Sequence, residues 1–97
     1  PDVATVGGIT PWLEVARISA ENGLPTTTHG VHDLHVHLLA AIDHASFLEV
    51  HGFGLERFIA DSLAIGDGRA VVPDRPGHGV ELAWDQLALL DQKTAPK

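Results

Sequence analysis

The sequence contains no cysteine, few basic residues and no long apolar run. Without cysteine, a disulfide framework and thiolate chemistry are both excluded. This composition is typical of reducing compartments, so we expect a cytoplasmic protein. Six Lys and Arg against thirteen Asp and Glu leave a formal charge of −7, which argues against binding to nucleic acid or to an anionic membrane. No apolar run approaches the roughly 18 residues that a membrane span needs.

The first half of the sequence alternates between short apolar or β-branched runs and stretches with helical periodicity. Thr10 suits the N-cap of a first helix and Pro11 its first position, and Asn22-Gly23 predicts its end. A strand, a second helix and a further strand are predicted over residues 24–28, 31–42 and 47–50. The expected buried stripe of the second helix is Leu34, Leu38, Leu39 and Ile42. With Pro1-Asp2 as the tail of a first strand, this β-α-β-α-β order predicts a parallel sheet with right-handed crossovers.

The second half of the sequence is less regular. After one short helix within residues 53–65, the turn Gly66-Asp67-Gly68 predicts a β-hairpin. Residues 73–79 are rich in proline and glycine, and we expect them to be irregular. A helix within residues 80–90 and a frayed tail over residues 91–97 complete the predicted order.

Three ionisable residues, Asp2, His29 and Glu49, each close a short apolar or β-branched run. In an α/β barrel, the C-terminal ends of neighbouring parallel strands converge on one pocket. An Asp within hydrogen-bonding reach of an imidazole fixes its tautomer, so His29 is a candidate general base and Asp2 its orienting partner. Glu49 would hold a substrate carboxylate oxygen if protonated, or position another polar group. Structural roles stay open: a helix cap or turn for Asp2, and a salt bridge for Glu49.

The length indicates part of a larger protein. A complete eight-stranded barrel needs about 250 residues, whereas this sequence has 97 and starts at Pro1 without an initiator Met. Three parallel strands would also leave unpaired sheet edges, which need a covering partner. A small non-catalytic interaction domain that binds a partner chain is therefore an alternative to an enzyme fragment.

A group of closely spaced histidines offers another alternative. His32 and His35 are three residues apart and would share a helical face, with His37 nearby. This spacing could indicate a metal-binding domain, but it is not a known closed zinc pattern and no cysteine is available. The simpler interpretation is histidines at a helix surface or interface. We expect Trp12 and Trp84 to pack rather than to bind a ligand.

Several motifs together resemble the mandelate racemase-like branch of the enolase superfamily. Residues 1–10 resemble the segment around its sixth barrel strand, and Thr28-His29-Gly30 its seventh-strand histidine. Glu49, within residues 47–50, matches its eighth-strand glutamate. Residues 72–80 resemble the P-x-x-P-G-x-G tail that follows the barrel. The likeness covers about the first ninety residues, including the spacings of 27 residues from Asp2 to His29 and 20 from His29 to Glu49.

The resemblance implies an α/β fold, the C-terminal portion of a TIM-type (β/α) barrel with strands 6 to 8, followed by a hairpin and tail. Residues 1–52 would carry the catalytic strand ends, and residues 53–97 would pack on the barrel and on a capping domain. It implies a reaction that begins with removal of the proton next to a substrate carboxylate, with Mg²⁺ stabilising the charge that develops. His29 would be the base, assisted by Asp2, and Glu49 would hydrogen-bond the substrate carboxylate.

The resemblance also implies that essential parts lie outside these 97 residues. The Mg²⁺ carboxylates belong to the third to fifth strands and a lysine base to the second, so this chain alone should be inactive. The expected partners are the remainder of the parent chain, a small carboxylate substrate such as an acid sugar, and further copies in a homo-oligomer. We expect an acid-sugar dehydratase, in which His29 could also act as the acid that assists loss of hydroxide. Racemisation of a 2-hydroxy acid is the alternative.

Overall fold

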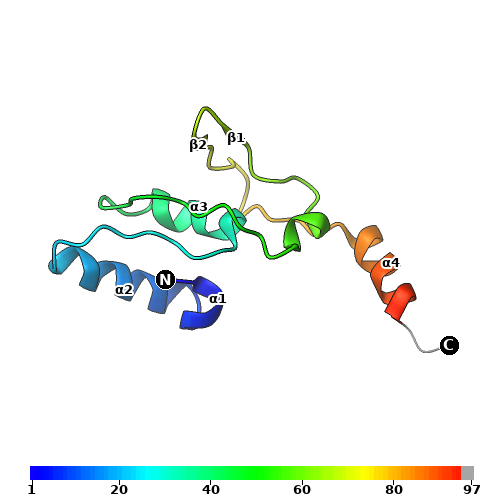
Figure 1. The fold of residues 1–97 in the computed structure, drawn as a ribbon, viewed down its shortest axis with the longest axis horizontal. Coiled ribbons are helices and arrows are strands. Elements are labelled where there is room, and N and C mark those ends of the chain that lie inside the picture. Colours follow the sequence, from blue (N-terminus) through cyan, green and yellow to red (C-terminus); the bar gives the residue numbers. More distant parts are fainter. Residues whose placement is uncertain (95–97) are drawn as a thin grey trace.

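The computed structural model describes residues 1–94, which form an elongated molecule (Figure 1). Its elements are α1 (Val3–Val6), α2 (Ile9–Glu21), α3 (His32–Ala40), the 3-10 helix η1 (Leu55–Phe58), β1 (Ile65–Gly66), β2 (Arg69–Ala70) and α4 (Trp84–Thr94). The first three helices gather at one end, and α4 extends from the other. The radius of gyration is 15.5 Å, compared with about 13 Å for a compact domain of 100 residues. The chain is therefore less compact than a typical independent domain.

Two consecutive glycines separate α1 from α2. Gly7 ends α1 in the left-handed region at a φ of 108°, and Gly8 is the N-cap of α2 at a φ of 110°. The prediction that Thr10 caps this helix is wrong, because the Trp12 N–H already donates to the Gly8 carbonyl at 3.2 Å. Thr10 and Pro11 are the second and third residues of α2. Pro11 is tolerated there because N–H groups in a first helical turn have no partner within the helix.

Two extended segments, residues 24–29 and 44–50, lie side by side and run in parallel. They meet in a parallel bridge between Thr26 and Ala45, with the Thr26 N–H donating to His44 and the Ser46 N–H to Thr26. The two segments are parallel, as predicted, but they form a single isolated bridge and not the predicted regular strands. Beyond this bridge, the Glu49 N–H donates to the Thr28 side chain and not to a backbone carbonyl.

The core lies between α2 and α3. Its buried members are Val3, Trp12, Ala16, Leu38 and Leu39. Trp12 is fully buried, as predicted, and Leu38 and Leu39 belong to the predicted stripe of α3, whereas Leu34 and Ile42 pack at its margin. α3 is shorter than the predicted helix over 31–42, because Val31 adopts a left-handed conformation and the helix ends at Ala40.

The hairpin and α4 dominate the second half. β1 and β2 pair in antiparallel fashion around Asp67 and Gly68, which both have positive φ, as a two-residue type I′ turn requires. The predicted hairpin is thus confirmed. The predicted helix within residues 80–90 is present, since α4 spans Trp84–Thr94, but the prediction that the chain frays from residue 91 is wrong for residues 91–94. Residues 80–83 are held extended by a bridge between Ile59 and Leu82. The rest of the predicted tail, residues 95–97, lies outside the described residues.

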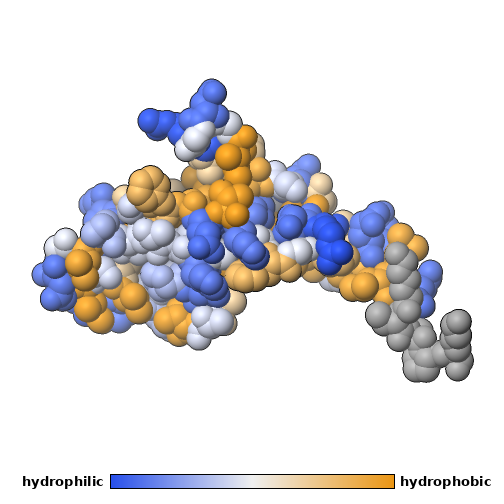
Figure 2. Space-filling view, in the orientation of Figure 1, coloured by the Kyte–Doolittle hydropathy of each residue, from blue (hydrophilic) through white to orange (hydrophobic). Residues whose placement is uncertain are grey.

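Large apolar side chains remain exposed along the molecule (Figure 2). Phe47 is 77% exposed and Trp84 is 71% exposed, so the prediction that both tryptophans pack holds for Trp12 and fails for Trp84 within residues 1–94. Such surface is unusual for a monomer on its own and is typical of faces that contact other protein. Among residues 1–94, no helix combines the length and apolar character needed to cross a bilayer.

Candidate active site

Asp2 lies immediately before α1, and its two carboxylate oxygens have different partners. Oδ1 accepts the Ala4 N–H at 2.8 Å and caps α1. Oδ2 lies 3.4 Å from Nδ1 of His29. The hydrogen bond from Ala4 lowers the pKa of Asp2, with smaller contributions in the same direction from His29 and His35, and partial desolvation opposes them. Asp2 therefore combines the structural role of a cap with a contact to the imidazole.

His29 is fixed through its backbone, while its ring stays accessible. Its N–H donates to the Pro1 carbonyl at 3.2 Å, which sets the end of the extended segment beside Asp2. Its side chain is 62% exposed. The ring packs at a tilt against Phe53, with 5.6 Å between ring centroids. Since a carboxylate only accepts hydrogen bonds, Asp2 favours the tautomer with the proton on Nδ1, and Nε2 is then the nitrogen left for proton transfer.

Glu49 approaches the same place from the second extended segment. Its Oε1 accepts the N–H of Gly30 at 3.0 Å, one residue after His29. Its own N–H donates to Oγ1 of Thr28 at 3.3 Å, one residue before His29. The three predicted residues, which are remote in the sequence, therefore meet around residues 28–30. An imidazole beside one carboxylate, with a second carboxylate bound to the next peptide N–H, is an arrangement suited to moving protons.

Gly30 connects these groups and tolerates no side chain. Its φ is +62°, and a Cβ built there would lie 2.1 Å from the Phe53 ring. Its N–H binds Glu49, and its carbonyl lies 2.5 Å from Nδ1 of His35. The glycine is needed for the backbone conformation and for close approach of the ring.

Two bulky residues beside the site have positive φ. Val31 follows Gly30 at a φ of 38°, and Phe53 has a φ of 54°. A β-branched or bulky residue with this conformation is an outlier, and such strain clusters at functional sites. Both residues adjoin His29, through the chain or through a ring contact, so the strain is consistent with a functional role for this edge.

The three clustered histidines do not form a metal site. His35 has no exposed surface and His32 is 7% exposed, so of the predicted surface or interface positions the surface one is wrong for both. Nε2 of His35 accepts the Val3 N–H, and Nε2 of His37 lies 2.8 Å from the His78 carbonyl, so these nitrogens point in different directions. Nowhere within residues 1–94 do three or more His, Cys, Asp or Glu side chains form a group suited to a metal ion.

Sequence reasoning did not find the connecting role of His35. In the sequence, His35 stands out only as one of several closely spaced histidines. This spacing does not show which of them is buried, because the histidines fall on several faces of α3. Its burial depends on α3 being covered on more than one side. Likewise, no local pattern indicates the contact between Gly30 and Phe53, because it joins residues that are 23 apart.

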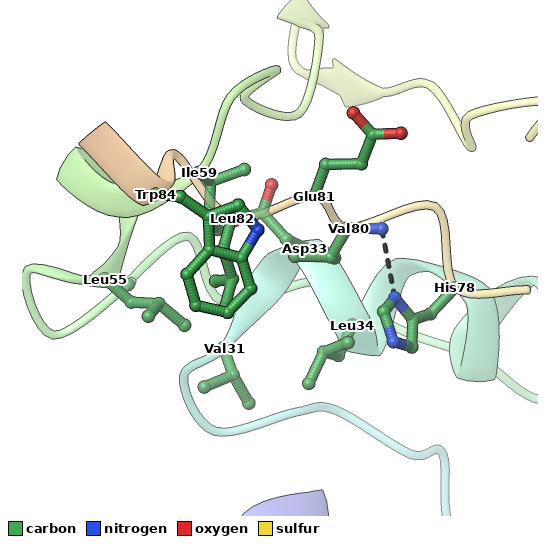
Figure 3. A pocket seen from close by; sticks show the side chains of 11 residues that line it. Val31, Asp33, Leu34, Leu55, Ile59, His78, Val80, Glu81, Leu82 and Trp84 are labelled. Carbon is green, nitrogen blue, oxygen red and sulfur yellow. Dashed lines mark hydrogen bonds between the residues drawn. The ribbon is translucent and has the colours of Figure 1, made fainter. Parts of the chain in front are cut away.

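A separate apolar cleft of about 560 Å³ opens between the start of α3 and residues 78–84 (Figure 3). Trp84, Leu82 and Leu55 line it together with Val31 and Leu34. Two of its polar side chains are already engaged: Asp33 accepts the Leu63 N–H, and His78 accepts the Val80 N–H. None of Asp2, His29 and Glu49 lines this cleft.

Comparisons with known proteins agree on one family. Residues 1–86 match the family described as enolase C-terminal domain-like. The chain is 47% identical over 90 residues to a 3,6-anhydro-alpha-L-galactonate cycloisomerase of Streptomyces coelicolor, covering 93% of the chain and 25% of that protein. The chain thus spans about a quarter of the length of the curated relatives it matches.

Solved structures give the same picture. A racemase from Streptomyces coelicolor A3(2) with bound magnesium superposes with a TM-score of 0.85 at 43% identity, covering 93% of this chain and 24% of that one. An L-talarate dehydratase from Polaromonas sp. JS666, complexed with Mg and L-glucarate, has a TM-score of 0.82 at 40% identity, covering 91% and 23%. The described fold is therefore that of a quarter of these larger proteins.

Proposed function

The chain belongs to the enolase C-terminal domain-like family, and from this premise we propose that it is the last part of a barrel enzyme that eliminates water from an acid sugar. The observation that carries the proposal is the meeting of Asp2, His29 and Glu49 around one short stretch of backbone. It is supported by relatives described as a dehydratase of an acid sugar and as an acid-sugar cycloisomerase.

In this proposal His29 transfers the proton. Asp2 holds Nδ1, so Nε2 faces the substrate and exchanges a proton with it. The imidazole either removes the proton at C2, next to the carboxylate, or donates a proton to the hydroxyl that leaves C3. In both cases the C2–H and C3–O bonds break, water leaves, and the resulting enol becomes a 2-keto-3-deoxy acid. The 3.4 Å separation from Asp2 is long for a hydrogen bond, and such contacts tighten when substrate binds.

Glu49 is proposed to contact the substrate carboxylate. Its Oε1 binds the N–H of Gly30, so the other carboxyl oxygen is available to the substrate. A protonated carboxyl group there donates a hydrogen bond to the carboxylate oxygen on which charge develops when the C2 proton is removed.

We propose Mg²⁺ as the cofactor of the complete protein, because solved relatives are described with bound magnesium. Residues 1–94 do not fit a metal site, since they contain no suitable group of three His, Cys, Asp or Glu side chains. The ligands are therefore expected elsewhere in the complete protein. The contribution of this segment to the reaction is the placement and transfer of protons.

The proposal also covers the second part of the chain. We propose that residues 53–97 pack against a further domain of the complete protein, while residues 1–52 carry the reacting groups. The support is the exposed apolar surface of this part, which includes Phe53, Val71 and Trp84. The open cleft beside Trp84 (Figure 3) would then be closed by residues from that domain.

Opening of an anhydro sugar is a second candidate, favoured by the 47% identity to the cycloisomerase. The same side chains serve both reactions, because each begins with loss of the C2 proton and breaks a C3–O bond. In dehydration the oxygen leaves as water, whereas in ring opening it stays attached to the sugar. We therefore expect substrate fit, rather than His29, to decide between the two activities.

The test is His29→Asn in the complete protein, with acid sugars and 3,6-anhydro acid sugars as substrates in D₂O. NMR follows product formation and exchange at C2. We expect product formation to fall by about 10³-fold, within the range that general acid–base groups supply. Loss of C2 exchange as well assigns His29 as the base, and retained exchange assigns it as the acid.

His37→Asn is the matched control, since its ring contacts the His78 carbonyl away from the site. The control should keep its activity. Undiminished product formation by His29→Asn would remove His29 from the mechanism. A complete protein that acts on neither substrate class, but exchanges the proton of a 2-hydroxy acid, would replace elimination by racemisation.

A further inference from the structure

One fully buried imidazole joins the backbone on both sides of the Asp2–His29 pair. Nε2 of His35 accepts the N–H of Val3 at 2.9 Å, directly after Asp2 in the sequence. Its Nδ1 lies 2.5 Å from the carbonyl of Gly30, directly after His29. Accepting from one backbone group and donating to the other requires the neutral ring with its proton on Nδ1. The ring therefore connects two chain segments that are 27 residues apart.

The surroundings of His35 leave the ring little freedom. It has no exposed surface, and the Trp12 ring lies 6.1 Å away, centroid to centroid. Because Gly30 also donates its N–H to Glu49, the hydrogen bonds run without a break from Val3 through His35 and Gly30 to Glu49. All three site residues are thus attached to this chain of bonds or adjacent to it.

We propose that His35 is a positioning residue that sets the separation between the Asp2 carboxylate and the His29 imidazole by binding the backbone next to each. This rests on the proposed function, in which that pair moves the substrate proton. His35 does not touch the substrate. Its effect is geometric: without it, the start of α1 next to Asp2 and the end of the extended segment at His29 can move apart. A misplacement of about 1 Å in such a pair can cost about 100-fold in rate.

The test compares two substitutions at this position in the complete protein. His35→Leu removes both hydrogen bonds and keeps an apolar side chain. His35→Gln keeps one donor and one acceptor on its amide. We expect His35→Leu to lower kcat by about 100-fold, with KM changed much less, because the reacting pair rather than the substrate contacts is displaced. His35→Gln should recover most of the lost kcat.

Two controls separate positioning from general destabilisation. Leu38→Ala lies on the same helix and weakens the core without touching the hydrogen bonds. His37→Gln repeats the chemical change two residues away. Both should keep kcat close to that of the unaltered protein, even where Leu38→Ala lowers the melting temperature as much as His35→Leu. A loss of kcat in Leu38→Ala equal to that in His35→Leu, at equal melting temperature, would reduce His35 to an ordinary core residue.

A measurement on the unaltered protein covers the case in which His35→Leu does not fold. Long-range ¹H–¹⁵N NMR correlations distinguish the two neutral tautomers of a histidine. We expect His35 to be protonated on Nδ1 near neutral pH. Protonation on Nε2 would exclude acceptance from Val3 and overturn the proposal.

The outcomes distinguish this inference from the proposed function. If His29→Asn abolishes product formation while His35→Leu folds and retains full kcat, the positioning role fails and the proposed function stands. If His29→Asn is fully active, the proposed function fails. In the His29→Asn background, His35→Leu should cause little further loss, and a second 100-fold loss there would show that His35 acts on something other than His29.

Discussion

The two parts of the chain are stabilised in opposite ways. Residues 1–52 contain the whole main core and the hydrogen bonds that join Val3, His35, Gly30 and Glu49. Residues 53–94 bury only Ile59 and Leu63 among their large apolar side chains, and leave several others exposed. The first part therefore positions its polar groups with its own residues, whereas the second offers apolar surface to something else.

This contrast locates the candidate site on the self-supporting part. A proton-transfer pair must be held within a narrow range of geometry, which requires side chains whose surroundings are fixed. The Asp2–His29 pair adjoins a fully buried imidazole and a fully buried indole. The cleft beside Trp84 is lined mostly by apolar side chains, of which Leu55, Leu82 and Trp84 are exposed. It is better suited to packing than to catalysis.

The strongest test of the contrast compares the two tryptophans. Trp12 is fully buried, and Trp12→Ala should lower the free energy of unfolding of the complete protein by about 3–5 kcal/mol. Trp84 is 71% exposed in residues 1–94. If a further domain covers it, as proposed, Trp84→Ala should cost about 2 kcal/mol. Urea unfolding followed by circular dichroism measures both. A cost near zero for Trp84→Ala would leave this surface uncovered and contradict the proposed packing.

A smaller effect is expected at the junction of the two parts, where the Phe53 ring meets Gly30. Gly30→Ala forces a Cβ into the ring and a left-handed conformation on alanine. The conformation alone costs about 1–2 kcal/mol, and the overlap adds to it. We expect a loss of at least about 2 kcal/mol in urea unfolding.

The matched experiment is the double variant Gly30→Ala with Phe53→Ala. Removing the ring relieves the overlap and leaves the backbone strain, so the double variant should lose less stability than the sum of the two single changes. If the stability losses of the two single variants simply add up, the Phe53 ring does not restrict the size of the side chain at residue 30. Product formation by the complete protein should fall in Gly30→Ala, because the peptide that binds Glu49 and His35 is displaced.

Two substitutions of Asp2 distinguish its role as the N-cap of α1 from its contact with the His29 imidazole. Asp2→Ala loses both, and should cost about 1 kcal/mol in stability, as is usual for a cap. Asp2→Asn keeps an oxygen for the Ala4 N–H and should therefore be nearly as stable as the original. In product formation, however, both should be strongly impaired, since the amide no longer provides the charge that stabilises the imidazolium. Full activity of Asp2→Asn would reduce Asp2 to a cap.

The sequence was sufficient for local features and for the family, but not for tertiary burial. The Asp67-Gly68 turn and the end of α2 at Asn22-Gly23 follow from backbone preferences of those residues, and both are present. The start of α2 was misplaced because Gly8 has no side chain to signal a cap. The prediction of regular strands over residues 24–28 and 47–50 was wrong because a strand needs a neighbouring strand to pair with. A β-branched run does not show whether that neighbour is present. Burial of His35 depends on what covers α3, which periodicity does not reveal.

The weakest effect at neutral pH is the contribution of His35 to the pH dependence of stability. Burial lowers the pKa of His35 below its usual 6.5, while the hydrogen bond to Gly30 and the charge of Asp2 oppose this. The unfolded chain therefore binds a proton near pH 6.5 that the folded protein does not take up. The neutral His35 ring therefore makes its full contribution to the free energy of unfolding above about pH 6.5. This contribution declines as the pH falls below that value towards the pKa of His35 in the folded protein.

Replacing the ring with a group that does not titrate isolates this contribution. His35→Gln should flatten the decline in urea midpoint between about pH 6.5 and 5, compared with the unaltered protein. Asp2, His29 and the N-terminal amine act on the ring at position 35 and are present in both proteins, so the difference between the two profiles removes most of their effect. His37→Gln should leave the profile unchanged. An identical slope for His35→Gln and the unaltered protein would mean that the folded and unfolded states bind the His35 proton equally, which would contradict the preference of the buried ring for its neutral form.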